Sequence, residues 1–243
     1  LFTSYGGLDT QGGYNIRVGR SEDPAGPYFD AEGRNLYYAR GTNQQFSRIG
    51  AKLIGNHSWS GTTGIPVLDR GYLSPGHNSA LYDEDLEEAF LIFHARFQGG
   101  GEGHRIRTHH LLLNDEGWPV VSPFRYGGET DSIEDIFATD FYALNDANGK
   151  AFNFHILDMQ KDTSAEIHTS EPIVFYEDGH WETENNSGAW SLNNGYFHMK
   201  NDLGDASGRA LRQWNPLLGQ VSPVATVMHE DGSCSFIAPV PAE

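Results

Sequence analysis

Short apolar runs separated by glycine, asparagine, aspartate and proline make up most of the chain, and the spacing of an amphipathic helix is almost absent. Turn signals such as Asp23–Pro27 and Asn114–Gly117 stand between these runs. Many short strands with such punctuation are typical of an all-β protein. The expected strands are Leu1–Tyr5, Tyr14–Arg20, Leu36–Ala39, Ser79–Tyr82, Phe90–Phe97, His104–Leu113, Pro172–Tyr176, Tyr196–Met199, Ala210–Trp214 and Ala225–His229.

One internal repeat is visible in the first half of the chain. Leu1–Ser4 and Tyr14–Val18 line up without a gap on Leu91–His94 and His104–Thr108. Each copy has an aliphatic and aromatic strand, a glycine-rich loop and a second strand with an Ile-Arg pair. Hairpins that recur in this way suit the blades of a β-propeller. Two unrelated β-hairpins of similar length would give the same pattern, so both interpretations stay open.

A polar, glycine-rich segment near Tyr126–Asp135 ends the repeat-like pattern and predicts a domain boundary. We expect residues 1–127 to form one domain and residues 130–243 to form a second, independent β-barrel or sandwich. Strand alternation is expected to turn four aromatic side chains into the core of this second domain: Trp181, Trp190, Phe197 and Trp214.

Acidic residues strongly outnumber basic ones: 33 Asp and Glu against 16 Lys and Arg give a formal net charge of −17 over 243 residues. Such a charge repels phosphate, so we expect no nucleic acid and no anionic membrane among the partners. No apolar run approaches the roughly 20 residues that a membrane-spanning helix needs. The first residue is not Met, so we expect a mature product or part of a longer protein. The single cysteine, Cys234, excludes an internal disulfide framework and a cysteine-based zinc site.

Eleven histidines raise the question of a metal site. Four of them crowd one segment: His94, His104, His109 and His110. Adjacent strand residues face opposite ways, so we interpret this group as exposed or hydrogen-bonded strand histidines. His77 differs, because it follows a Pro-Gly turn within Ser74–Ser79, and a loop imidazole is a better functional candidate. A structural His77, bonded to backbone carbonyls, is the alternative.

Carboxylates and aromatic residues give weaker signals. The acidic run Asp83–Glu88 is interpreted as a solvated turn, and no facing carboxylate pair suited to glycoside hydrolysis stands out. The glycines of Gly99–Gly103 lie between strands, so they form a loop and not a phosphate site. Five aromatic residues could stack on sugar rings, although each is more commonly a core residue: Tyr5, Tyr14, Trp59, Tyr72 and Trp118.

Several specific stretches resemble glycoside hydrolase family 43, and within it the endo-1,5-α-L-arabinanases. The matching stretches are Leu1–Gly7, Gly13–Ser21, Gly50–Asn56, Ser74–Ser79 and Asn114–Val121. Leu211–Trp214 is similar to a motif in the C-terminal β-domain of the larger, two-domain members. The resemblance covers most of residues 1–127 in family order and is thinner over residues 130–243.

The resemblance implies an all-β fold: the C-terminal part of a five-bladed β-propeller over residues 1–127, followed by an accessory β-barrel-like domain over residues 130–243. It implies endo-acting, inverting hydrolysis of α-1,5-linked L-arabinan, a pectin side chain, by a secreted enzyme in the extracellular space or periplasm. The partners would be arabinan and arabino-oligosaccharides. Acid–base catalysis with inversion needs two carboxylates far enough apart to admit a water.

The family's catalytic residues, a base Asp, a pKa-tuning Asp and an acid Glu, would all precede residue 1. We therefore assign no catalytic carboxylate to this chain and expect it to be inactive alone. We expect the N-terminal part of the enzyme to pack against Leu1–Phe97 through a large apolar interface. The resemblance implies that His77 binds a hydrated calcium ion at the propeller centre, and it suggests Tyr5, Gly6 and Asn78 as substrate-binding residues.

Two other functions stay open. One is an exo-acting arabinofuranosidase or xylosidase of the same family, which would release only monomers from linear arabinan. The other is a non-catalytic, carbohydrate-binding propeller, which the missing carboxylates make worth testing.

Overall fold

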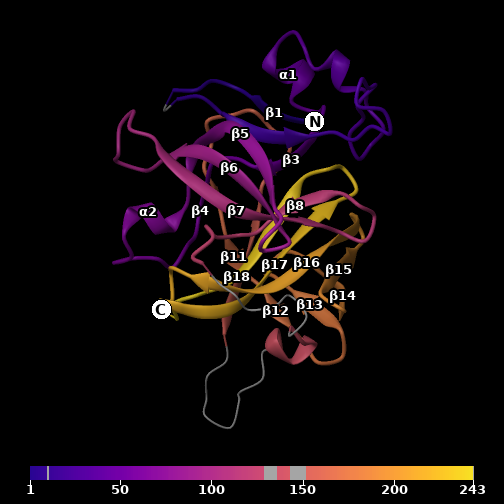
Figure 1. Cartoon of the computed structure of the whole chain (residues 1–243). Helices are drawn as coiled ribbons and strands as arrows, with labels where there is room; N and C mark the ends of the chain where they lie inside the picture. Colours follow the sequence, from indigo (N-terminus) through magenta and orange to yellow (C-terminus); the bar gives the residue numbers. More distant parts are fainter. Residues whose placement is uncertain (10, 129–135, 143–151, 243) are drawn as a thin grey trace.

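Strands carry almost all the regular structure of the computed structural model, which describes residues 1–9, 11–128, 136–142 and 152–242 (Figure 1). Within these residues, helical structure is limited to four short turns: η1 (Leu36–Tyr38), α1 (Asn43–Phe46), α2 (Val67–Arg70) and η3 (Ala138–Asp140). The expectation of an all-β fold is confirmed. Residues 129–135, which hold most of the expected domain boundary, lie outside the described part of the chain.

Two antiparallel sheets come from the first half of the chain, and we call them the N-terminal sheets. One has the order β1 (Phe2–Tyr5), β2 (Asn15–Val18), β3 (Ala51–Ile54). The other runs in chain order through β5 (Leu73–Asp83), β6 (Glu88–Arg96), β7 (Arg105–Leu113) and β8 (Pro119–Val121). The predicted strand Leu36–Ala39 is wrong, because the Asn35 side chain accepts a hydrogen bond from the backbone N–H of Tyr37 (2.9 Å) and starts the turn η1.

A nine-stranded antiparallel sheet, the barrel, comes from the second half. Its strands are β9 (Asn153–Asp158), β11 (Glu171–Pro172), β12 (Val174–Phe175), β13 (His180–Glu182), β14 (Ser187–Asn193), β15 (Tyr196–Asn201), β16 (Gly204–Asn215), β17 (Gln220–His229) and β18 (Cys234–Val240). The strand order is β11-β9-β18-β17-β16-β15-β14-β13-β12. The two edge strands, β11 and β12, are separated in the chain by Ile173 alone, so the sheet curls until its edges nearly meet (Figure 1).

The interior of the barrel is aromatic, as the alternation of its strands predicts. Trp181, Trp190 and Phe197 are buried together there. Trp214 is the exception: it is 38% exposed, and its prediction as a core residue is wrong. Trp214 has the same phase as the buried Ala206 and Ala210 on β16, but it lies at the end of that strand, beyond the filled part of the interior.

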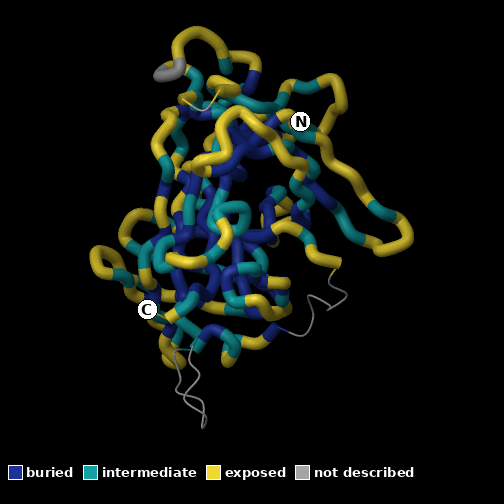
Figure 2. The backbone as a smooth tube through the Cα atoms, turned by 90° about the vertical axis from the view of Figure 1, so that its left-hand side faces the viewer, coloured by how far each residue is buried: buried dark blue, intermediate teal, exposed yellow. Residues whose placement is uncertain are grey.

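The outer face of the barrel shares a second core with the N-terminal sheets. Along β17, Ala225 and Val227 face the barrel interior, whereas Val224 and Met228 pack with N-terminal residues such as Leu53. Strands β17 and β18 are therefore buried on both faces over most of their length. A short parallel pair, β4 (His57–Ser58) with β10 (His168–Thr169), adds backbone hydrogen bonds between the two halves. Figure 2 shows that buried backbone runs through the middle of the molecule.

Charged groups are buried at the same junction. The guanidinium of Arg17 donates to the backbone carbonyls of Ser47 and Asp162 (2.6 Å each). The ammonium of Lys52, whose side chain is 2% exposed, lies 2.6 Å from a carboxylate oxygen of Asp162. Burial lowers the pKa of Lys52 to about 8, against the opposing effect of Asp162. Burial alone would raise the pKa of Asp162, but hydrogen bonds from His168 and Lys52 hold it well below its usual range.

We expect Asp162→Asn to lower the free energy of unfolding by about 3 kcal/mol, because the substitution leaves the Lys52 ammonium buried without its counter-charge. Urea unfolding of the intact protein at pH 7, followed by circular dichroism, measures the change. Glu84→Gln, in an exposed turn, is the matched control and should stay within about 0.5 kcal/mol of the wild type. A loss as small as that of the control would contradict a stabilising role for Asp162.

Candidate functional site

His77 lies on an irregular segment at the start of β5. Its backbone φ is 51°, and that of Ser74 is 47°, so two residues other than glycine adopt the left-handed conformation within four positions. The pairing of β5 with β6 shifts register on both sides of Gly76. Such backbone is costly and gathers at functional sites, so the strain supports His77 as a functional residue.

Hydrogen bonds from β1 hold this segment. The Ser4 hydroxyl accepts a bond from the backbone N–H of His77 (3.1 Å) and donates to the side-chain oxygen of Asn78 (3.0 Å). The backbone of His77 and the side chain of Asn78 are thereby tied to one point on β1. The His77 side chain is left exposed.

Two further histidines stand in a row with His77, which we call the imidazole row. The ring centroid of His94, on β6, lies 5.7 Å from that of His77 and 4.3 Å from that of His104, just before β7. Tyr14 flanks the row, with its ring centroid 6.0 Å from that of His94. The interpretation of His94 and His104 as exposed or hydrogen-bonded strand histidines is therefore incomplete, because pairing of β5, β6 and β7 also brings them to His77.

Two rings of the imidazole row, those of His94 and His104, have lowered pKa values. Burial lowers the pKa of His94, and the neighbouring His104, His77 and Arg96 lower it further. Burial and then Arg96 also lower the pKa of His104, whose Nε2 accepts a hydrogen bond from the Arg96 guanidinium (3.0 Å). Arg96 is in turn paired with Glu102. Neutral imidazoles can accept hydrogen bonds or donate a lone pair to a cation.

Tyr5 and Gly6 occupy different surroundings. The ring of Tyr5 packs edge-on against Phe46, with centroids 5.5 Å apart, and lies 5.2 Å from the Arg17 guanidinium. Neighbouring side chains on a strand alternate, so Tyr5 points away from the side on which Ser4 meets Asn78. Gly6 has a φ of 85°, and an added Cβ would lie 2.4 Å from the carbonyl oxygen of Gly13. Of the predicted substrate-binding residues, only Asn78 adjoins the His77 backbone.

The remaining candidates are structural. His109 is buried between the Ser122 carbonyl (2.8 Å from Nδ1) and the Tyr72 hydroxyl (3.0 Å from Nε2), which confirms its interpretation as a hydrogen-bonded strand histidine. Trp59, Tyr72 and Trp118 belong to the shared core, so none of them offers a face to a sugar.

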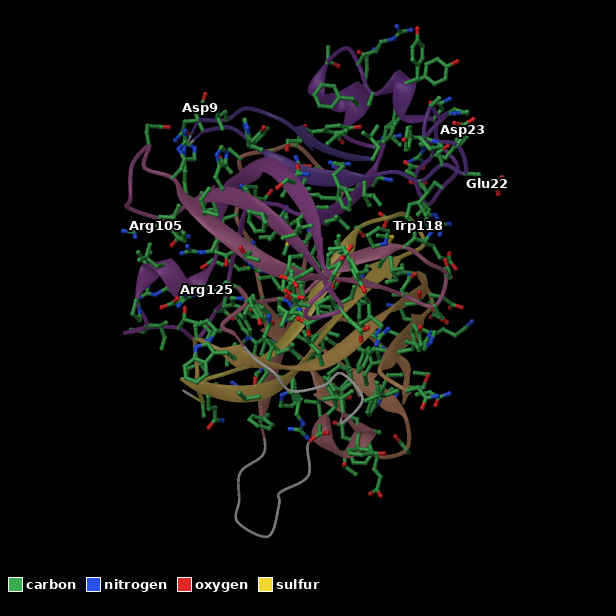
Figure 3. The ribbon with its side chains drawn as sticks, viewed as in Figure 1. Asp9, Glu22, Asp23, Arg105, Trp118 and Arg125 are labelled. Atoms are coloured by element: carbon green, nitrogen blue, oxygen red, sulfur yellow. The ribbon has the colours of Figure 1, made fainter. Side chains whose placement is uncertain are left out.

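The structure gives His77 no cage of protein ligands. Within the described residues, no three His, Cys, Asp or Glu side chains gather closely enough to hold a metal ion. Calcium prefers oxygen ligands, so the exposed imidazole of His77 could supply one ligand at most. In Figure 3, Asp9 of the β1–β2 loop and Arg105, the residue after His104, lie on one side of the molecule, and Trp118 lies on the other.

Relatives of known activity resemble part of this chain. An extracellular endo-α-(1→5)-L-arabinanase of Thermotoga petrophila is 52% identical over 132 residues, which are 54% of this chain and 28% of that protein. No protein-family model matches the chain. No helix in its described part is long and apolar enough to cross a bilayer.

Two solved structures match the fold over nearly the whole chain. The endo-1,5-α-L-arabinanase of T. petrophila superimposes with a TM-score of 0.87 at 34% identity, covering 99% of this chain and 52% of that one. The family 43 glycoside hydrolase YxiA of Bacillus licheniformis gives 0.85 at 34% identity, covering 100% and 52%. The resemblance to family 43 endo-arabinanases is thus confirmed. This chain spans about a quarter of the curated relative and about half of each solved structure.

We expect the stability of the protein to fall between pH 7 and pH 5 because of two buried histidines. Burial lowers the pKa of His57 to about 4 and that of His109 to about 3. Below an unfolded pKa of about 6.5, the unfolded chain binds more protons, so the free energy of unfolding falls as the pH falls, by about 2 kcal/mol per histidine at pH 5.

Urea unfolding at the two pH values checks this expectation. His109→Gln should reduce the difference between them, whereas His180→Gln, at an exposed position, should leave the difference unchanged. Equal free energies of unfolding at pH 7 and pH 5 in the wild type would show that the buried histidines are not linked to stability.

Proposed function

We propose that this chain is the C-terminal part of an extracellular endo-1,5-α-L-arabinanase that hydrolyses arabinan with inversion. The observation that carries the proposal is the strained placement of His77 beside the imidazole row, in a chain whose relatives of similar fold are arabinanases. The catalytic base, the pKa-tuning Asp and the acid would come from the part of the enzyme that precedes Leu1.

His77 would hold a hydrated calcium ion at the centre of the propeller. When bound, this ion supplies positive charge beside the catalytic carboxylates. The chain's own contribution is positional: Ser4 fixes the His77 backbone and Asn78, and the ring of His94 lies beside that of His77. Asn78, Tyr5 and Gly6 remain proposed substrate-binding residues.

An exposed apolar face of the β5–β8 sheet supports the proposal that further blades of a propeller pack against this chain. Leu81 is 49% exposed and Ile106 is 67% exposed, and register places both on the face that carries His94. The opposite face, with Leu91 and Phe93, is already buried in the shared core. Preceding blades that cover Leu81 and Ile106 would bring their residues next to the imidazole row, and residues 1–127 would then complete a five-bladed propeller.

Hydrolysis of linear arabinan by the intact protein tests the proposed activity. We expect arabino-oligosaccharides of several lengths to appear early, because endo action cuts internal bonds. Residues 1–243 alone should not degrade arabinan at a measurable rate. Release of arabinose alone would establish the exo-acting alternative. Binding of arabinan without cleavage by the intact protein would establish the non-catalytic alternative.

Replacing His77 tests its role directly. We expect His77→Ala in the intact protein to lower kcat by about 100-fold or more and to abolish stimulation by calcium, with little change in thermal stability. His180→Ala, an exposed histidine on β13, is the matched control and should keep full activity. Full activity of His77→Ala would instead show that His77 is structural.

A further inference from the structure

One segment of the second half of the chain forms hydrogen bonds with residues near the His77 site. Residues 159–167, between β9 and β10, run along the start of β2, where Asp162 accepts the hydrogen bonds of Arg17 and Lys52. Three residues farther on, the carbonyl of Ala165 accepts a hydrogen bond from the side-chain amide of Asn56 (3.3 Å). The side-chain oxygen of Asn56 in turn accepts a hydrogen bond from the backbone N–H of Ser74 (2.6 Å). The segment is thus bonded directly to Arg17 of β2, and through Asn56 to Ser74 at the start of β5.

The same segment supports the loop between β1 and β2. Gly13 lies directly on its backbone: a Cβ at this position would stand 2.2 Å from the carbonyl oxygen of Thr163 and 2.1 Å from that of Ser164. The Gly13 carbonyl also accepts a bond from Asn15 (2.6 Å), whose side-chain oxygen accepts from Arg17 (2.7 Å). Only a glycine permits this approach, so the position of the next residue, Tyr14, depends on the barrel.

The ring of Tyr14 packs against two residues of the site, Gly76 and His94. The ring covers Gly76 so closely that a Cβ there would stand 2.1 Å from a ring carbon. Gly76 immediately precedes His77, and the same ring borders His94 in the imidazole row. The ring therefore limits the movement of both the backbone before His77 and the imidazole next to it.

We propose that Tyr14 is a positioning residue for His77, and that the β9–β10 segment of the barrel holds Tyr14 in place through Gly13. The inference rests on the proposed function of His77 and deepens it: the barrel is required for the geometry of the site as well as for stability. Packing of the ring performs this role, so the phenol oxygen is not needed.

Comparison of Tyr14→Ala with Tyr14→Phe in the intact protein tests the first half of the proposal. We expect Tyr14→Ala to lower kcat on linear arabinan at least about tenfold with KM within about twofold, and Tyr14→Phe to restore wild-type kcat. The second readout is the nuclear Overhauser effect between the ring protons of His77 and His94, which should vanish in Tyr14→Ala and persist in Tyr14→Phe. If Tyr14→Ala does not fold, Tyr14→Leu replaces it with the same expectations.

Gly13→Ala tests the second half, because its methyl group would collide with the two barrel carbonyls while Tyr14 stays intact. We expect the same loss of kcat and of the His77–His94 effect. Gly103→Ala, whose Cβ would make an ordinary 3.5 Å contact, is the matched control and should behave as the wild type.

The outcomes separate the two proposals. An unchanged His77–His94 effect in Tyr14→Ala or Tyr14→Leu overturns the role of Tyr14, and an unchanged effect in Gly13→Ala overturns the role of the barrel. A wild-type protein that fails to cleave arabinan overturns the proposed function, and the nuclear Overhauser measurements still decide whether Tyr14 positions His77.

Discussion

Two cations that cannot reach water determine how the halves of this chain fit together. Arg17 and Lys52 are buried in the N-terminal sheets, and Asp162 of the barrel accepts hydrogen bonds from both, through its backbone carbonyl and its carboxylate. A buried cation without such partners is strongly destabilising. The shared apolar core attracts the two halves without fixing their orientation, whereas these charge-assisted bonds tolerate little displacement and set the register.

The geometry of the candidate site depends on these hydrogen bonds of Arg17 and Lys52. Asn15 bridges the Arg17 guanidinium and the carbonyl of Gly13, so the anchored end of β2 and the loop beside His77 are parts of one hydrogen-bonded unit. From the other side, Asn56 joins the barrel carbonyl of Ala165 to the strained residue Ser74. Strained backbone persists only where its surroundings determine it fully, and here the surroundings include the barrel.

Local pattern predicted much of this structure, and what it missed depends on long-range pairing. Strands such as β6 and β7, and the hydrogen-bonded interpretation of His109, follow from alternation within one segment. The imidazole row does not follow from alternation within one segment. His94 lies near His77 and His104 only because it pairs with Gly76 on β5 and with Ile106 on β7. Trp214 has the right phase but lies beyond the filled interior, and strand phase carries no information on where a barrel ends.

Burial on two faces also distinguishes this barrel from an accessory domain on a tether. A tethered domain would alternate apolar and polar residues on its outer strands, whereas β17 buries Val224 and Met228 on its outer face and Ala225 and Val227 on its inner face. Removing the barrel would expose that outer core to water and take away the partner of Lys52. The glycine contact beneath Tyr14 would be lost in the same step, so stability and site geometry depend on one interface and are expected to change together.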